Sequence, residues 1–169
     1  FMLLGRFIFA VVVASLFVPL LFLAIENFFS NRRLSWTVSL IGTFSPMALG
    51  LSRHASPDHY IIAFSTAVLW ACSVIMSPQS DEQKRNKWTR ITGLIIGCAI
   101  GVKYYSVVFA IPLLVTHYFR HKSIKSFFTS KAIWTAGLMC LLGFLLTNPY
   151  VPDQFGRFLR DFQTNVRNY

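Results

Sequence analysis

Ionisable side chains gather in one short stretch of a chain that otherwise has few of them. The sequence LSRHASPDHY, residues 51–60, contains Arg53, His54, Asp58 and His59, and apolar sequence flanks it on both sides. Asp58 is one of only 6 acidic residues in the chain, against 16 Lys and Arg. Carboxylate and imidazole are ligand types for a divalent metal. The stretch therefore either forms a site or marks the charged start of a helix.

Both interpretations of Asp58 stay open. Pro57 suits the first turn of a helix and Ser56 suits the N-cap, so Asp58 would lie at the positive end of a helix dipole. A carboxylate near a bilayer is unfavourable, however, and such residues typically mark function. His54 and Asp58 are four apart and would share a helix face, where His59 could join them around a metal. Pro57 argues against a continuous helix there and disfavours the metal site.

The elements that must position these groups are expected to be membrane spans. The chain is 54% hydrophobic and 13% charged, whereas an ordinary soluble domain is about 25% charged. A helix that crosses a bilayer needs roughly 20 apolar residues. The apolar stretches that reach or approach this length are Phe7–Ile25, Leu34–Leu51, Tyr60–Met76, Trp88–Val102, Tyr104–Phe119 and Ala132–Thr147. We predict an all-α, polytopic bundle of about six spans, a single transmembrane domain over residues 1–169, with residues 148–169 as an outer segment.

Basic residues alternate between the two sides of this predicted bundle. Short loops rich in Lys and Arg stay in the cytoplasm. One side holds Arg32, Arg33, Lys84, Arg85, Lys87, Arg90, Arg120, Lys122, Lys125 and Lys131, and the other holds Arg6, Arg53, Lys103, Arg157, Arg160 and Arg167. Both chain ends and the Asp58 stretch are therefore predicted outside. The net charge of +10 is explained by topology, and we expect no nucleic-acid partner because no motif for one is present.

The glycines and prolines make further predictions about packing. The sequence GLIIGCAIG places Gly93, Gly97 and Gly101 on one helical face. Small residues at this spacing let a neighbouring helix approach closely. Pro46 and Pro112 lie inside predicted spans and are expected to kink them.

The chain is expected to be an internal piece of a longer polytopic protein. It begins with Phe1, and no basic leader followed by a small-residue cleavage site precedes the first span. Such a leader would mark a signal peptide. Cys72, Cys98 and Cys140 fall within predicted spans and form no CxxC pair. They are interpreted as small buried hydrophobic residues.

The order of these features resembles that of the C-type membrane glycosyltransferases, in particular the protein O-mannosyltransferase and aminoarabinose-transferase superfamily. The resemblance covers nearly the whole chain. It consists of a first span near LLGR, a span that ends in a P…S…A.PD pattern, a GL..G.A.G.KY span and an NPY…D…F exit. The residues that carry it are Leu3–Arg6, Pro46, Ser52, Ala55, Pro57, Asp58, Gly93, Leu94, Gly97, Ala99, Gly101, Lys103, Tyr104, Asn148, Pro149, Tyr150, Asp153 and Phe155.

The resemblance implies an enzyme that transfers a hexosyl or pentosyl group on the extracytoplasmic face of a bacterial inner, plasma or ER-like membrane. The donor would be a polyprenyl-phosphate-linked sugar, and the acceptor a protein, lipid or glycan. The general base of such enzymes, usually an aspartate in the first outer loop, would precede this sequence. Asp58 would be a supporting acidic residue of the catalytic site, with His54 beside it, and would hold a divalent metal if one is needed. Lys103, Tyr104 and Arg53 would face the donor phosphate, since Lys serves as a mobile point charge.

Two other classes stay open. A secondary transporter would also have basic inner loops, but it would place ionisable residues at mid-span and often show internal repeats. Here the charges cluster at span ends and no repeat is found. A non-catalytic subunit of a membrane complex would show no dependence of activity on Asp58 or Lys103.

Overall fold

The computed structural model describes residues 2–44, 58–121, 127 and 129–167. All regular secondary structure in these residues is helical, which confirms the all-α prediction for them. The helices are α1 (Met2–Phe29), α2 (Arg32–Thr43), α4 (Asp58–Met76), α5 (Glu82–Val102), the 3₁₀-helix η1 (Tyr104–Phe109), α6 (Ala110–His121), α8 (Lys131–Thr147) and α9 (Phe155–Arg167).

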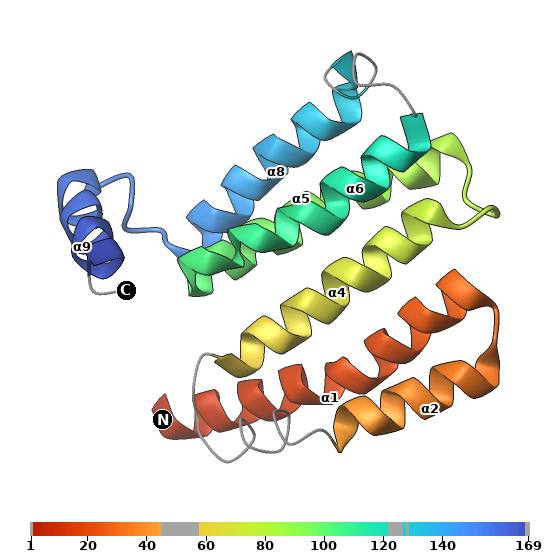
Figure 1. Cartoon of the computed structure of the whole chain (residues 1–169). Coiled ribbons are helices and arrows are strands. Elements are labelled where there is room, and N and C mark those ends of the chain that lie inside the picture. The colour runs from red at the N-terminus through yellow and green to blue at the C-terminus, as the bar shows by residue number, and fades with distance from the viewer. Residues whose placement is uncertain (1, 45–57, 122–126, 128, 168–169) are drawn as a thin grey trace.

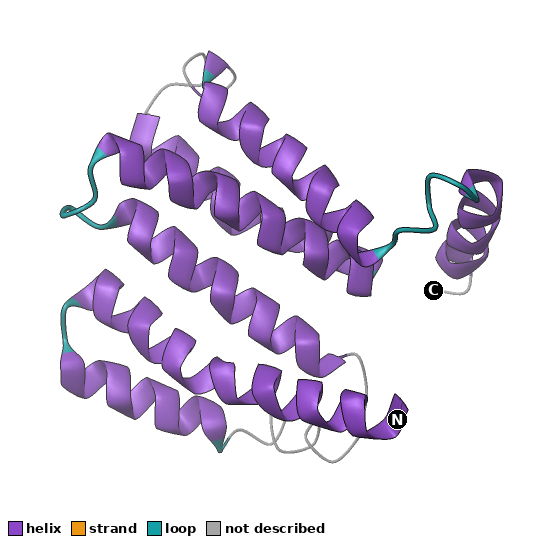
Figure 2. Ribbon diagram, turned by 180° about the vertical axis from the view of Figure 1, so that it is seen from behind, coloured by secondary structure: helices purple, strands orange, loops and turns teal. Residues whose placement is uncertain are grey.

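The long helices lie side by side and alternate in direction (Figure 1). α1 packs against α2 and α4, α4 packs against α5 and α6, and α5 packs most extensively against α8. A view from behind shows the same order, with α9 set apart from the bundle beyond the end of α8 (Figure 2). The two most extensive contacts, of α5 with α8 and of α1 with α4, thus join helices that are not consecutive in the sequence.

Local sequence explains where several helices begin. The Asn31 side chain accepts a hydrogen bond from the Leu34 N–H at 3.1 Å and so caps α2. The Asp81 side chain accepts one from the Lys84 N–H at 2.7 Å and caps α5. Such side chains satisfy N–H groups that have no partner inside the helix. Ser30, with φ of 50°, makes the sharp turn between α1 and α2.

The buried core lies between α4, α5, α6 and α8. The Trp70 and Trp88 rings meet edge to face, 4.8 Å between centroids, and join α4 to α5. Edge-to-face aromatic pairs add to the stability that burial provides. The fully buried core side chains are Val68, Cys72, Ile75, Ile96, Leu113 and Ala136. These contacts hold α4, α5, α6 and α8 together as one core.

The alternating directions gather the connections at two ends of the bundle (Figure 1). One end carries the turns that join α1 to α2 and α4 to α5. There the Arg120 guanidinium pairs with the Glu82 carboxylate and also donates to Asn86 Oδ1 at 3.4 Å. The hydrogen bond from Arg120 lowers the pKa of Glu82 below its usual value. We call this the basic end, because the basic connections predicted from the sequence meet here.

The helix bounds refine two of the predicted stretches. α5 begins at Glu82, well before the predicted Trp88, because Asp81 caps it and charged side chains do not break a helix. The stretch Tyr104–Phe119 divides into η1 and α6. Pro112 is the third residue of α6. In the first turn of a helix, backbone N–H groups have no partner within the helix, so a proline there does not require the kink that we expected. Pro46 lies outside the described residues.

Within the described residues, the helices fall short of the combined length and apolar character that a membrane-crossing segment requires.

Candidate functional site

Lys103 stands where α5 ends and η1 begins. Its backbone is extended, with φ of −149° and ψ of 127°. The Lys103 N–H donates to the Ala99 carbonyl at 3.0 Å, and its own carbonyl accepts from the Ser106 N–H at 3.0 Å. The half-buried Lys103 side chain therefore starts from a backbone position that is held on both sides.

The ammonium group of Lys103 lies near an aromatic ring. Lys103 Nζ is 5.5 Å from the centroid of the Tyr105 ring. A cation within about 6 Å of such a ring is attracted to its face. Tyr105 is half-exposed, so this contact holds the charge near the surface of the molecule.

A second segment meets the end of α5 directly. Asn148 caps the C-terminus of α8 and is buried, with 7% of its surface exposed. Its side-chain amide donates to the Gly101 carbonyl oxygen at 3.2 Å. A Cβ atom on Gly101 would overlap the side chains of Thr147 and Asn148. Gly101 is therefore required for this contact, and the NPY segment lies against the turn that carries Lys103.

The close approach predicted from the glycine stripe is confirmed along the whole interface of α5 and α8. A Cβ atom on Gly93 would overlap the backbone of Ala136, and one on Gly97 would overlap the backbone of Cys140. From the opposite side, Gly143 of α8 faces the Leu94 carbonyl just as tightly. The backbones of α5 and α8 are in contact. This contact holds α5 against α8 and so sets the position of Lys103, which follows α5 directly.

An aromatic cluster extends from Lys103 toward α9. The Tyr104 ring meets the Phe158 ring edge to face at 6.1 Å between centroids. Phe158 also meets Phe144 of α8 at 5.8 Å. Tyr104 thus contacts a helix that follows it by about fifty residues in the sequence.

The start of α4 lies at the same end of the bundle as Lys103 and Asn148 (Figure 1). α4 begins at Asp58, which agrees with the helix start expected there. We call this the Lys103 end. The other predicted site residues of this stretch, Arg53 and His54, lie outside the described residues, as does the side chain of Asp58. In the described part of the chain no cluster of His, Cys, Asp and Glu has the makings of a metal site, and a metal at Asp58 stays a prediction.

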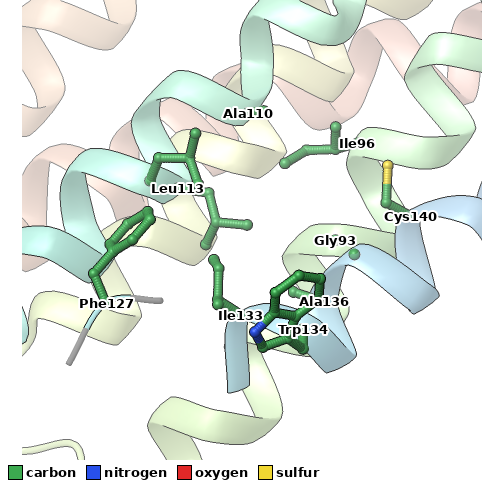
Figure 3. Close-up of a pocket in the computed structure, with 11 residues that line it drawn as sticks. Gly93, Ile96, Ala110, Leu113, Phe127, Ile133, Trp134, Ala136 and Cys140 are labelled. Atoms are coloured by element: carbon green, nitrogen blue, oxygen red, sulfur yellow. The ribbon is translucent and has the colours of Figure 1, made fainter. Parts of the chain in front are cut away.

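An apolar cavity of about 320 Å³ opens between α5, α6 and α8. Leu113, Phe127, Ile133 and Trp134 line it together with small residues such as Gly93 (Figure 3). Its walls offer almost no polar surface, so it suits an apolar group better than a sugar or a phosphate.

Sequence reasoning missed two features of the Lys103 end. Asn148 was expected only as part of a sequence pattern, although a buried amide after a long apolar helix indicates a cap that must find partners. Residues 148–169 were expected only as an outer segment. They contain α9, whose apolar residues recur with the period of a helix, a signal that was present in the sequence.

The structure brings the GL..G.A.G.KY and NPY segments of the sequence pattern together at one end of an apolar helical bundle. Comparison with family models agrees with the class that this pattern resembles, the C-type glycosyltransferases. The model of the dolichyl-phosphate-mannose-protein mannosyltransferase family matches residues 3–148, and the chain belongs to this family. Members of the family are glycosyltransferases and integral membrane proteins. No curated protein and no solved structure matches the chain.

Proposed function

We propose that the full-length protein transfers a sugar of the mannose type from a polyprenyl-phosphate carrier to an acceptor on the extracytoplasmic face of a membrane. The family description favours a protein as the acceptor, and a lipid or glycan acceptor stays open. The observation that supports this most directly is the hydrogen bond from Asn148 to Gly101. It joins the GL..G.A.G.KY segment, which bears Lys103 and Tyr104, to the NPY segment that follows α8.

The outer faces of the bundle support a membrane location. Ile111 and Phe119 of α6 are more than half exposed, as are Leu138 and Leu146 of α8. Large apolar patches of this kind are unusual on proteins that face water and typical of surfaces that face lipid or a partner. The described apolar faces thus suit a bundle surrounded by acyl chains, with its two ends at the two interfaces.

The proposed chemistry explains why a cation is needed at the Lys103 end. The acceptor oxygen attacks C1 of the sugar, and the bond from C1 to the carrier phosphate oxygen breaks. The acceptor proton goes to a general base, and the lipid phosphate leaves with its negative charge. Charge that develops in the transition state is stabilised best by a group already in position. Lys103, held by backbone contacts and by Tyr105, is our candidate for this role.

Donor kinetics of Lys103 variants test this assignment. Lys103→Met should raise the donor KM or abolish turnover, because the phosphate loses its counter-charge. Lys103→Arg should keep part of the activity, since the charge survives with a different geometry. Lys84→Met, an exposed lysine at the basic end, is the matched control and should leave both constants unchanged. Donor titration of the full-length enzyme in nanodiscs measures this. Parental kcat and donor KM in Lys103→Met would remove Lys103 from the site.

Asp58 is proposed as a carboxylate that shapes the acceptor side or holds a divalent metal. Asp58→Asn should then remove most transfer activity at an unchanged level of membrane insertion, because the amide keeps the size and loses the charge. Adding Mg²⁺ or Mn²⁺ to enzyme treated with a chelator separates the two roles. Parental activity of a normally inserted Asp58→Asn enzyme would reduce Asp58 to a helix-end charge.

A further inference from the structure

α9 separates apolar from charged residues more sharply than any other described helix. Phe155, Phe158 and Leu159 recur at the spacing that puts side chains on one helical face. Arg157 and Arg160 fall on the other side of the same helix. The family match ends at residue 148, so α9 lies beyond the part of the chain that the family comparison covers.

Only part of the apolar face of α9 has a described contact with the bundle. Phe158 is half-buried against Tyr104 and Phe144. Phe155 is 57% exposed and Leu159 is 40% exposed, although both belong to the same face. A helix that existed only to cover the bundle would bury these residues as well. The exposed pair therefore calls for a second apolar environment beside the Lys103 end.

The charges of α9 indicate which environment this is. Arg157 and Arg160 are both exposed and lie on the face opposite the aromatic residues, where the sequence also places Asp161. Helices with this composition lie in the plane of a membrane interface, with the apolar face among the upper acyl chains. Arginines at that depth attract the phosphates of anionic lipids. A protein partner would equally cover the apolar residues but would not by itself account for the arginines beside them.

We propose that α9 is an interfacial helix whose partner is the anionic headgroup layer of the bilayer at the Lys103 end. Phe155 and Leu159 enter the acyl region, Arg157 and Arg160 bind headgroup phosphates, and Phe158 fastens the helix to Tyr104. The lipid surface thereby helps to position the residue next to Lys103. This rests on the membrane location in the proposed function, but not on the identity of the sugar donor or on a catalytic role of Lys103.

Spin labels on two faces of α9 test the proposal in the full-length protein reconstituted into vesicles. One nitroxide is placed through Leu159→Cys, and its matched control through Thr164→Cys, an exposed position on the polar side. Native cysteines are first replaced by alanine. In vesicles of phosphatidylcholine with phosphatidylglycerol, the label at 159 should be reached by O₂ more than by a water-soluble nickel chelate. The label at 164 should show the reverse.

The arginines are tested by charge removal and by lipid composition. Each basic residue near an anionic surface favours binding by roughly fivefold. Arg157→Gln with Arg160→Gln should therefore shift the label at 159 toward the nickel chelate in anionic vesicles and change little in pure phosphatidylcholine. Free access of the chelate to position 159 in both vesicles would overturn the proposal. So would shielding of position 159 from both reagents, because that result shows a protein partner.

The same samples separate this proposal from the proposed function. Absence of donor-dependent transfer, with normal labels at 159 and 164, would contradict the enzymatic proposal and leave the interfacial helix standing. Normal transfer with the label at 159 exposed to water would contradict the interfacial helix and leave the enzymatic proposal standing.

Discussion

At the scale of single residues, Asn148 holds the Lys103 end together. Its amide nitrogen lies 3.2 Å from the Gly101 carbonyl oxygen and 3.3 Å from both the Phe144 carbonyl and Thr147 Oγ1. All three neighbours can accept a hydrogen bond, and the residue is buried. A buried position surrounded by three acceptors requires a donor such as an amide. A carboxylate in its place would add a fourth acceptor and a charge.

Two substitutions of Asn148 should therefore differ in their effect: alanine removes the hydrogen bonds of the amide, and aspartate adds repulsion between oxygen atoms. Asn148→Ala should lower the free energy of unfolding by about 1 kcal/mol, the typical net value of a hydrogen bond. Asn148→Asp should be more destabilising, since its carboxylate would face oxygen atoms in a buried place. Gln154→Ala removes an exposed amide that accepts only a long hydrogen bond of 3.5 Å from Arg157, so it should change stability much less. Thermal unfolding of the full-length protein in detergent measures all three, and equal stability of the Asp variant would contradict this role.

At the scale of helices, the contact of α5 with α8 is the feature that the sequence predicted best. Three small residues four positions apart give a groove whatever the partner, so Gly93, Gly97 and Gly101 indicated a close neighbour before its identity was known. The structure identifies the partner as α8, whose small residues Ala136, Cys140 and Gly143 face the stripe.

Two glycines at this interface allow a matched test of the packing. A Cβ atom on Gly97 would overlap backbone atoms of Cys140, whereas one on Gly137 of α8 would meet nothing within 4 Å. Gly97→Ala should lower stability by about 1–3 kcal/mol, as overpacking typically does. Gly137→Ala should be neutral or stabilising by up to about 1 kcal/mol, because alanine favours a helix. Unfolding of both variants in the same detergent decides it. Equal melting temperatures would show that the two backbones are farther apart than described.

Other parts of the fold were beyond sequence reasoning for physical reasons. Long apolar stretches indicate helices, so most predicted stretches begin and end within a few residues of the observed helices. The end of α5 depends on a backbone change at Lys103 that no side-chain pattern records. The contact of Phe158 with Tyr104 depends on tertiary packing. The structure gives the positions of Lys103 and Tyr104, and the roles of all the predicted site residues, Lys103, Tyr104, Asp58, His54 and Arg53, stay predictions.

At the scale of the whole molecule, the described helices divide the charges between two ends. The basic end holds Arg120, whose pairing with Glu82 links α6 to α5. The other described basic residues of this end are Arg32, Arg33, Lys84, Arg85, Lys87, Arg90 and Lys131. The Lys103 end carries fewer cations: Arg6 near the start of α1, Lys103 itself and the arginines of α9. This asymmetry is the one that membrane proteins use to orient themselves, with the more basic side inside.

Cysteine labelling of intact cells tests the orientation that follows. In a variant of the full-length protein without native cysteines, single cysteines replace Lys84 at the basic end and Asp153 at the Lys103 end, both of them exposed positions. A maleimide that cannot cross membranes should label position 153 from outside and reach position 84 only after the membrane is permeabilised. The physical reason is that the many cations of the basic end hold it in the cytoplasm. Labelling of position 84 in intact cells would reverse the orientation and place the Lys103 end inside. A sugar transfer on the extracytoplasmic face would then be excluded for this site, whatever the kinetics of the Lys103 variants.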